Sequence, residues 1–197
     1  ALGADFTIAC PAFPTAGRTI YQGNLFVGEV LLSESGMKDH PLTPMRDASL
    51  VRLLAAQTSH GVGLVEHATI RQGAAAVTAA FDDRRTAGDR FAIVDALTDA
   101  DLLTIGEAVV GLALVTGGSG VALGLPENFR RQGRLGEAAV PELPPAVGRR
   151  VILAGSCSEA TRAQVARARA DGWPAFAVDP LAIAAGNDVA GAALAWL

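Results

Sequence analysis

The sequence is poor in the residues that characterise several classes of protein. Among its 197 residues there is one lysine, 5% are aromatic, and the net charge is −4. Without a run of basic residues there is no electrostatic footprint for nucleic acid, and so few aromatic rings offer no platform on which bases would stack. No apolar run approaches the ~20 residues that a helix needs to cross a bilayer. We therefore expect a soluble, cytoplasmic protein that binds neither nucleic acid nor membranes.

Cysteine is also scarce. The two cysteines, Cys10 and Cys157, lie far apart in the sequence, and neither has a partner at metal-ligand spacing. This pattern argues against both a disulfide and a zinc site. We therefore expect two reduced thiols in the core and no metal held by the protein.

What the chain does contain is a scaffold rich in Ala, Val and Leu, interrupted by one unusual stretch at residues 10–45. This stretch holds four prolines and four glycines and has no sustained apolar period, so we expect irregular backbone there. A compact domain seldom keeps so long an irregular segment unless the segment binds something. We therefore place the substrate at this stretch, with four candidate contacts: Arg18, Lys38, Asp39 and His40.

Two of these candidates have distinctive chemistry. The guanidinium of Arg18 is suited to clamp a carboxylate through two parallel hydrogen bonds. His40 lies between Asp39 and a proline, where an imidazole is suited to hydrogen-bond hydroxyl groups or to transfer a proton. The alternatives stay open, with Arg18 as a solvated loop charge and His40 as a structural histidine. We expect His60 and His67 to be structural.

Elsewhere the apolar pattern alternates between strands and helices, which indicates an α/β fold. Strands are expected at residues 6–9, 62–65, 90–94, 151–154 and 175–178, with a further strand or hairpin at 25–32. Helices are expected at residues 47–59, 69–85, 98–110 and 158–170 and from 181 onward, the first of them capped by Asp47. Residues 131–149 are rich in Pro and Arg, and we expect them to connect two α/β domains, each incomplete.

One motif, TGGSG at residues 116–120, follows an apolar segment. The backbone N–H groups of Gly117, Gly118 and Ser119 are suited to converge on a phosphate, although a tight turn before a helix would also need glycines. The motif is not a dinucleotide fingerprint, because Leu123 stands where the third glycine would fall, and it is not a P-loop, because it lacks a lysine.

A second motif, GSCS at residues 155–158, lies between a predicted strand and a predicted helix. Ser156 and Glu159 have the spacing of a capping box, which by itself would explain them. The alternative is that Ser156 and Ser158 contact a nucleotide at the start of that helix.

The blocks CPAFPTAGR, GNLFVGEVLLSESGMKDHPLTPM, VGLVEHATIRQG, TGGSG and AGSCS resemble the four-carbon acid sugar kinases over essentially the whole chain, and most closely their 3-oxo-tetronate 4-kinase branch. The resemblance implies an enzyme that transfers the γ-phosphoryl group of ATP, with Mg²⁺, to the terminal hydroxyl of a four-carbon sugar acid. It also allows a homo-oligomer. It implies that residues 1–130 are the C-terminal part of an acid-sugar-binding domain, that 131–149 are a linker, and that 150–197 are the N-terminal part of a nucleotide-binding domain. Arg18, Lys38, Asp39 and His40 would then contact the sugar acid, and ATP would meet the following residues: Gly117, Gly118, Ser119, Ser156 and Ser158.

The chain departs from the family in one important way. The family's opening strand carries an Asp-Asp-Phe-Thr-Gly-Ala-like motif with the expected base, whereas here Asp5-Phe6-Thr7 is followed by Ile8. The catalytic base is therefore unknown, and we expect an internal fragment of a kinase with little or no activity of its own. The alternative is a non-catalytic module that binds small anions or sugar acids. A nicotinamide-dependent dehydrogenase is disfavoured by Leu123.

Overall fold

The computed structural model describes residues 3–40, 42–136, 140–148 and 150–197. The chain divides into two compact units, Ala1–Val140 (unit 1) and Pro141–Leu197 (unit 2). The division falls within residues 131–149, where the sequence predicts a linker. Pro41 and residues 137–139 and 149, which the sequence analysis placed in the substrate segment and the linker, lie outside the described residues. The part of a kinase domain that each unit represents stays a prediction.

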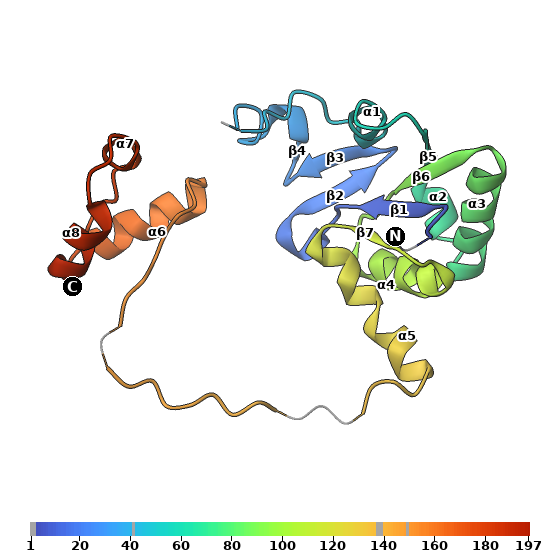
Figure 1. Cartoon of the computed structure of the whole chain (residues 1–197). Helices are drawn as coiled ribbons and strands as arrows, with labels where there is room; N and C mark the ends of the chain where they lie inside the picture. The colour runs from blue at the N-terminus through green and yellow to red at the C-terminus, as the bar shows by residue number, and fades with distance from the viewer. Residues whose placement is uncertain (1–2, 41, 137–139, 149) are drawn as a thin grey trace. The chain divides into compact units, whose positions relative to one another are not determined.

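A four-stranded sheet with the order β5-β6-β1-β7 forms the centre of unit 1 (Figure 1). Its strands are β1 (Thr7–Cys10), β5 (Gly61–Val65), β6 (Asp89–Val94) and β7 (Thr116–Gly117). The first three coincide with predicted strands, and the α/β class is confirmed. The central strands β1 and β6 read as almost continuous apolar runs, because a parallel strand that is covered on both faces exposes no polar side.

All four strands are parallel, so their C-terminal ends meet along one side of the sheet. We call this side the carboxyl edge and define it by the residues that follow the strands: 11–17 after β1, 66–67 after β5, 95 after β6 and 118–120 after β7.

A second, antiparallel sheet lies within the stretch that was predicted to be irregular. Strand β2 (Arg18–Tyr21) pairs with β3 (Asn24–Val27), which pairs with β4 (Val30–Leu31). Gln22 and Gly23 join β2 to β3 with φ values of 50° and 70°, the left-handed conformation that tight hairpin turns require. The prediction of irregular backbone is therefore wrong for β2 at residues 18–21, whereas β3 and β4 form a hairpin where a strand or hairpin was expected at 25–32. The strands have only 4, 4 and 2 residues, which is too short for an apolar alternation to show.

Helices and the small sheet cover opposite faces of the parallel sheet (Figure 1). Helices α3 (Ala74–Thr86) and α4 (Asp99–Ala108) lie on one face, and α1 (Leu50–Ala55) lies with β2–β4 on the other. Shorter elements complete the unit: α2 (His67–Ile70), α5 (Pro126–Arg131), and the 3₁₀ turns η1 (Pro14–Ala16), η2 (Leu32–Glu34), η3 (Val109–Gly111) and η4 (Ser119–Gly124).

Two predicted helices have different boundaries in the structure. The helix predicted at 47–59 is the shorter α1, and its cap is Ser49 rather than Asp47. Asp47 instead forms an ion pair with Arg52 at 2.6 Å, and the hydrogen bond from that guanidinium lowers the pKa of Asp47 to about 2. The helix predicted at 69–85 is divided into α2 and α3 because Gly73 has a φ of 95°, which no helical residue adopts.

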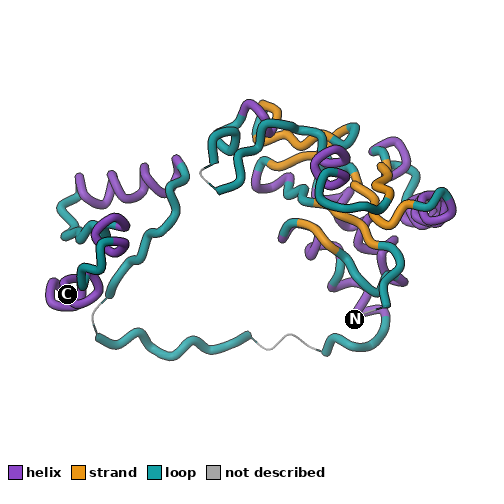
Figure 2. Tube along the Cα trace, turned by 45° about the horizontal axis from the view of Figure 1, so that its top comes forward, coloured by secondary structure: helices purple, strands orange, loops and turns teal. Residues whose placement is uncertain are grey.

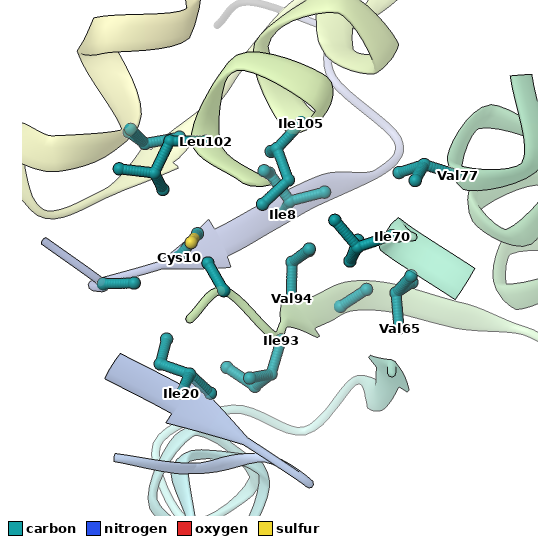
Figure 3. Packing of buried hydrophobic residues seen from close by; sticks show 14 of the residues in the cluster. Ile8, Cys10, Ile20, Val65, Ile70, Val77, Ile93, Val94, Leu102 and Ile105 are labelled. Atoms are coloured by element: carbon teal, nitrogen blue, oxygen red, sulfur yellow. The ribbon is translucent and has the colours of Figure 1, made fainter. Parts of the chain in front are cut away.

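The core of unit 1 packs on both faces of the parallel sheet (Figure 3). Ile8 of β1 lies toward Ile105 of α4 on one face, and Ile93 of β6 lies toward Ile20 of β2 on the other. All four side chains are at most 2% exposed. Burying an aliphatic side chain of this size contributes about 1.5–3 kcal/mol, so these layers dominate the stability of the unit.

The two cysteines are both free thiols, but only one lies in the core. Cys10 is buried at the end of β1, and this burial raises the pKa of its thiol to about 11. Cys157 is exposed, so the prediction of a core position is wrong for this residue.

Unit 2 consists of helices and loops (Figure 2). Its helices are α6 (Glu159–Ala170), α7 (Pro180–Ala184) and α8 (Val189–Trp196). The predicted strands at 151–154 and 175–178 form no ladder, and no residue that the structure describes in this unit is buried. An isolated strand cannot satisfy its backbone hydrogen bonds, and no neighbouring strand of unit 2 is available for pairing among the described residues. In both units, none of the described helices combines the length and the apolar character needed to traverse a bilayer.

Candidate sugar-acid site

At the carboxyl edge, Arg18 and the TGGSG motif both contact Phe13. Gly120 packs against Phe13, and Phe13 exchanges two backbone hydrogen bonds with Arg18, at 2.8 and 3.0 Å. In open α/β sheets ligands bind outside the carboxyl ends of the strands, where the loops converge and no helix covers the sheet. The predicted substrate arginine and the predicted glycine loop therefore flank one residue at the part of the fold where a ligand is expected.

Arg18 combines a fixed backbone with an available side chain. Its backbone is held by Phe13 on one side and by pairing with Val27 of β3 on the other. The side chain is exposed, and none of the residues that the structure describes forms an ion pair or a hydrogen bond with its guanidinium. Such a group can bind a carboxylate through two parallel hydrogen bonds without first breaking an internal contact.

Close packing accounts for the glycines of TGGSG. A Cβ atom on Gly117 would overlap the carbonyl oxygen of Cys10, and one on Gly120 would overlap the backbone after β1. The N–H of Gly118 donates to the carbonyl of Cys10 at 3.1 Å, so it is already used. Ser119 is exposed at the start of η4. Glycines are needed here because the backbone of this motif lies close to the backbone at the end of β1 and just after it. Their contact with ATP stays a prediction.

A buried carboxylate, Asp95, holds the carboxyl edge together. Its Oδ2 accepts hydrogen bonds from the N–H groups of Gln22 at 2.8 Å and His67 at 3.1 Å, and its Oδ1 accepts one from Gly23 at 2.9 Å. Burial raises the pKa of Asp95 above its ordinary value of 3.8, and the three N–H donors only partly offset this effect. Asp95 therefore fastens both the β2–β3 turn and the start of α2 to the parallel sheet.

Two further carboxylates lie in the first turn of α4. Asp101 forms a capping box with Thr98, and its Oδ2 accepts the N–H groups of Leu97 at 2.9 Å and Thr98 at 2.8 Å. Burial acts to raise the pKa of Asp101, but these hydrogen bonds outweigh it and the pKa is lowered. Asp99 accepts hydrogen bonds from the N–H and the hydroxyl of Thr15 in the loop after β1. The sequence predicts a helix from residue 98, but not that the acids of its first turn would hold other loops.

His67, which the sequence analysis took as structural, is the histidine at the carboxyl edge. Its backbone N–H donates to Asp95, and its Nε2 lies 3.3 Å from Oδ2 of Asp101. The side chain is 17% exposed, and its ring meets that of Tyr21 edge-on with a centroid distance of 6.4 Å. The sequence signal for this position was its place two residues after the apolar strand VGLV, which ends at Val65.

The other predicted substrate contacts follow η2 at the far side of the small sheet. Lys38, Asp39 and His40 lie beyond β4, and β4 is separated from β2 by one strand (Figure 1), or about 10 Å at ordinary strand spacing. Lys38 and Asp39 are exposed. Nδ1 of His40 accepts the N–H of Thr43 at 3.1 Å, so this imidazole shapes its own loop. The structure does not bring these three residues together with Arg18, and their contact with substrate stays a prediction.

The predicted nucleotide contacts Ser156 and Ser158 lie in unit 2. The cap of α6 is Ser158 rather than Ser156: Ser158 Oγ accepts the N–H of Thr161 at 3.2 Å, and Ser156 Oγ accepts the N–H of Ser158 at 3.1 Å. An open hollow of about 360 Å³ is lined by five residues: Ser156, Arg162, Val165, Ala166 and Arg169. A hydroxyl and two guanidinium groups are suitable partners for phosphate oxygens. A larger open hollow of about 470 Å³ lies on the same helix but is lined mainly by apolar side chains and by none of the predicted residues.

The described residues show no group of three His, Cys, Asp or Glu side chains that could hold a metal ion. Mg²⁺ in nucleotide enzymes is held by one or two carboxylates together with the phosphates of the nucleotide. At the carboxyl edge, Asp95 and Asp101 are already committed to backbone N–H groups. These carboxylates therefore do not fit a magnesium site.

Comparison with known proteins gives a consistent picture. Residues 1–125 match the family described as "Sugar-binding N-terminal domain". Over its full length the chain is 58% identical to a 3-oxo-tetronate kinase of Burkholderia multivorans and 56% identical to one of Cupriavidus necator, and it covers 46% of each. A crystal structure of a Haemophilus influenzae protein matches with a TM-score of 0.65 at 44% identity, over 89% of this chain and 41% of that one. A Bordetella bronchiseptica domain of unknown function, solved with bound citrate as a domain-swapped dimer, matches with a TM-score of 0.53 at 26% identity, over 87% of this chain and 39% of that one.

The chain thus spans a little under half the length of the curated relatives that it matches. The family match runs through more than half of the chain and includes every residue of the carboxyl edge. The chain therefore belongs to the sugar-binding N-terminal domain family and is a relative of the 3-oxo-tetronate kinases.

Proposed function

We propose that this chain forms the sugar-acid-binding part of an ATP-dependent kinase that phosphorylates the terminal 4-hydroxyl of a four-carbon sugar acid such as 3-oxo-tetronate. The observation that carries the proposal is the identity of 56–58% with two 3-oxo-tetronate kinases over all 197 residues. The similarity includes the loops of the carboxyl edge, where a ligand would be contacted. A shared substrate class is the simplest reason for so high an overall identity.

The geometry of the carboxyl edge supports an anionic, hydroxylated ligand. Arg18 offers a guanidinium for the carboxylate, and its backbone is held in place by Phe13 and Val27. The Bordetella bronchiseptica relative binds citrate, which also combines carboxylate and hydroxyl groups. A hydroxy acid placed here would meet a cation whose backbone is already in place.

The nucleotide would bring the phosphoryl group and most of the charge that must be neutralised. ATP supplies the γ-phosphoryl group, and the accompanying Mg²⁺ neutralises charge that develops on the phosphate oxygens. In this chain Ser156 and the two arginines that line its hollow would hold phosphate oxygens, and Ser158, Gly117, Gly118 and Ser119 are the further candidates. The residue that would act as base is not identified within this sequence.

A second candidate function is a non-catalytic module that binds a sugar acid. One observation favours it for the chain by itself: Asp5-Phe6-Thr7 is not followed by the family's glycine. Both candidates predict binding of a sugar acid at the carboxyl edge. They differ in whether ATP binds and turns over.

Isothermal titration calorimetry with 3-oxo-tetronate and, separately, with Mg²⁺-ATP tests the proposal. We expect the sugar acid to bind, and Arg18→Ala to weaken binding about tenfold or more, because a charge-assisted hydrogen bond contributes ~1.5–3 kcal/mol and 1.4 kcal/mol is tenfold. The matched control is Arg84→Ala, since this guanidinium lies 3.9 Å from Asp89 at the opposite end of β6. Failure of the sugar acid to bind would overturn the proposal.

A coupled assay for ADP release separates the two candidates. If the sugar acid binds but neither ATP binding nor ADP release is detected, the binding module is supported for this chain. ATP binding that is weakened by Ser156→Ala supports the kinase.

A further inference from the structure

The two ring nitrogens of His67 have different surroundings: Nε2 lies beside a carboxylate, and Nδ1 does not. Its Nε2 lies 3.3 Å from Oδ2 of Asp101. Within the part of the chain that the structure describes, Nδ1 has no hydrogen-bond partner, yet no side-chain nitrogen or oxygen there is both buried and unpaired. Nδ1 must therefore be reached by solvent, at an edge of the sheet where ligands bind.

Asp101 determines which nitrogen carries the hydrogen. Its Oδ2 already accepts two backbone N–H groups, which keep it ionised at neutral pH. The negative charge of this carboxylate favours a hydrogen on the ring nitrogen that faces it, Nε2, and Nδ1 of a neutral ring in this form presents a lone pair. A carboxylate that orients one imidazole nitrogen commonly leaves the other nitrogen to act on a ligand.

The surroundings of His67 hold the ring and connect it to the predicted carboxylate clamp. The backbone N–H of His67 is fixed by Asp95, and the same carboxylate fixes the turn that follows Tyr21. Tyr21 packs edge-on against the His67 ring and ends the strand that Arg18 begins. Arg18 and Tyr21 are therefore about 10 Å apart along β2.

From these contacts we infer that His67 is a ligand-contacting residue whose Nδ1 accepts a hydrogen bond from a hydroxyl group of the sugar acid, with Asp101 as the positioning residue that holds the ring. The inference rests on the proposed function and extends it. A polyhydroxy acid has a carboxylate for Arg18 and hydroxyl donors for a nitrogen lone pair. A purely structural histidine would need only the contact between Nε2 and Asp101.

The direct test is a long-range ¹H–¹⁵N spectrum of the ring nitrogens in the 197-residue chain, titrated with 3-oxo-tetronate at neutral pH. The chain has three histidines, so each ring can be assigned by substitution. We expect the Nδ1 signal of His67 to move in proportion to the bound fraction measured by calorimetry. His60 directly precedes β5 in the sequence, and its ring centroid lies 6.4 Å from that of Phe91. The chemical shifts of its ring nitrogens should not change.

Two substitutions separate ligand contact from a structural role. The amide of His67→Gln lies where Nε2 was and keeps the contact with Asp101, whereas the amide of His67→Asn lies where Nδ1 was and faces the ligand. We expect His67→Gln to weaken sugar-acid binding about tenfold, because it loses the one hydrogen bond that Nδ1 would accept. His67→Asn should weaken binding less, because its amide can replace that hydrogen bond. His60→Gln is the matched control and should bind as the unsubstituted chain does.

The outcomes distinguish this inference from the proposed function. If the unsubstituted chain does not bind the sugar acid, both are overturned. If the sugar acid binds while the His67 signals do not move, or while His67→Gln binds as tightly as the unsubstituted chain, the proposed function stands and His67 is structural. The spectrum of the unsubstituted chain gives the answer even if a variant fails to fold.

Discussion

A single carboxylate, Asp95, connects three separate segments at the carboxyl edge. It is fully buried, and a buried carboxylate is tolerated only when its oxygens are well supplied with donors. The donors here are the backbone N–H groups of Gln22, Gly23 and His67. Because Asp95 directly follows β6, any strain in the edge is transmitted to the core of the sheet.

Asp95→Asn should therefore destabilise the chain. An asparagine has one acceptor oxygen for three N–H donors, so at least one donor is left unpaired, and each costs about 1–3 kcal/mol. Urea unfolding should give Asp95→Asn a free energy of unfolding about 1–3 kcal/mol lower than that of the unsubstituted chain. The control is Asp82→Asn, whose side chain is 64% exposed and whose loss should change stability by less than about 0.5 kcal/mol. Equal stability of the two variants would contradict the role given to Asp95.

Asp101 should contribute a pH dependence with a definite sign. Its folded-state pKa lies below the ordinary 3.8, so its stabilising effect is fully present above pH 3.8 and is lost as the pH falls through the lowered value. Asp101→Asn should thus lower the free energy of unfolding by about 1 kcal/mol at neutral pH, as the loss of a helix cap does, and the difference should narrow below pH 3.8. Urea unfolding at a series of pH values measures this difference. A difference that is constant with pH would show that the carboxylate charge has no part in the effect.

At the scale of elements, α4 and η4 are in unusually close contact. A Cβ atom on Gly106 of α4 would overlap the backbone of Gly124 at the end of η4, and Asn128 of α5 donates to the carbonyl of Gly106. Glycine is normally unfavourable inside a helix, by about 1 kcal/mol relative to alanine. Its presence in α4 therefore reflects the approach of η4.

Gly106→Ala should destabilise the chain by about 1–3 kcal/mol, the usual range for overpacking, despite the better helix propensity of alanine. Gly111→Ala provides the comparison, because a Cβ atom added at that glycine would meet no neighbouring atom within 4 Å. Thermal unfolding should separate the two variants clearly. A Gly106→Ala variant as stable as Gly111→Ala would mean that η4 moves away at little cost.

The elements that the sequence predicts well are those whose signal is local. Strands β1, β5 and β6 are short apolar runs, and α4 lies within the helix expected at 98–110. Strands β3 and β4 lie in the strand or hairpin expected at 25–32, whereas β2 was missed because its stability comes from pairing with β3 and from Asp95, which lies far away in the sequence. The same reason hid His67: its position depends on Asp95 and Asp101, and neither contact shows in the local pattern VGLVEH. Arg18 was singled out because a stretch rich in Pro and Gly is itself a local signal, and its contact with substrate stays a prediction.

At the scale of the whole molecule, the two units differ in how they are stabilised. The buried hydrophobic residues that the structure describes all belong to unit 1. In unit 2 the apolar residues of the predicted strand at 151–154 are largely exposed, for example Leu153 at 92%. Hydrophobic burial is the main source of stability, so unit 1 should carry the cooperative transition of the chain.

A chain ending at Val140 should therefore unfold at nearly the same temperature as the full chain. We expect differential scanning calorimetry to show a single main transition in both, with midpoints within about 3 °C, which corresponds to less than 1 kcal/mol for a unit of this size. Loss of the transition on removal of residues 141–197 would show that unit 2 stabilises unit 1.

The central claim is that the carboxyl edge of unit 1 binds a sugar acid, and hydrogen–deuterium exchange of the 197-residue chain with and without 3-oxo-tetronate tests it most directly. The account predicts slower exchange in residues 11–23, 66–68 and 117–121, with Arg18 and His67 inside the protected segments. Protection confined to residues 36–45 or to unit 2, or no protection at saturating ligand, would contradict it.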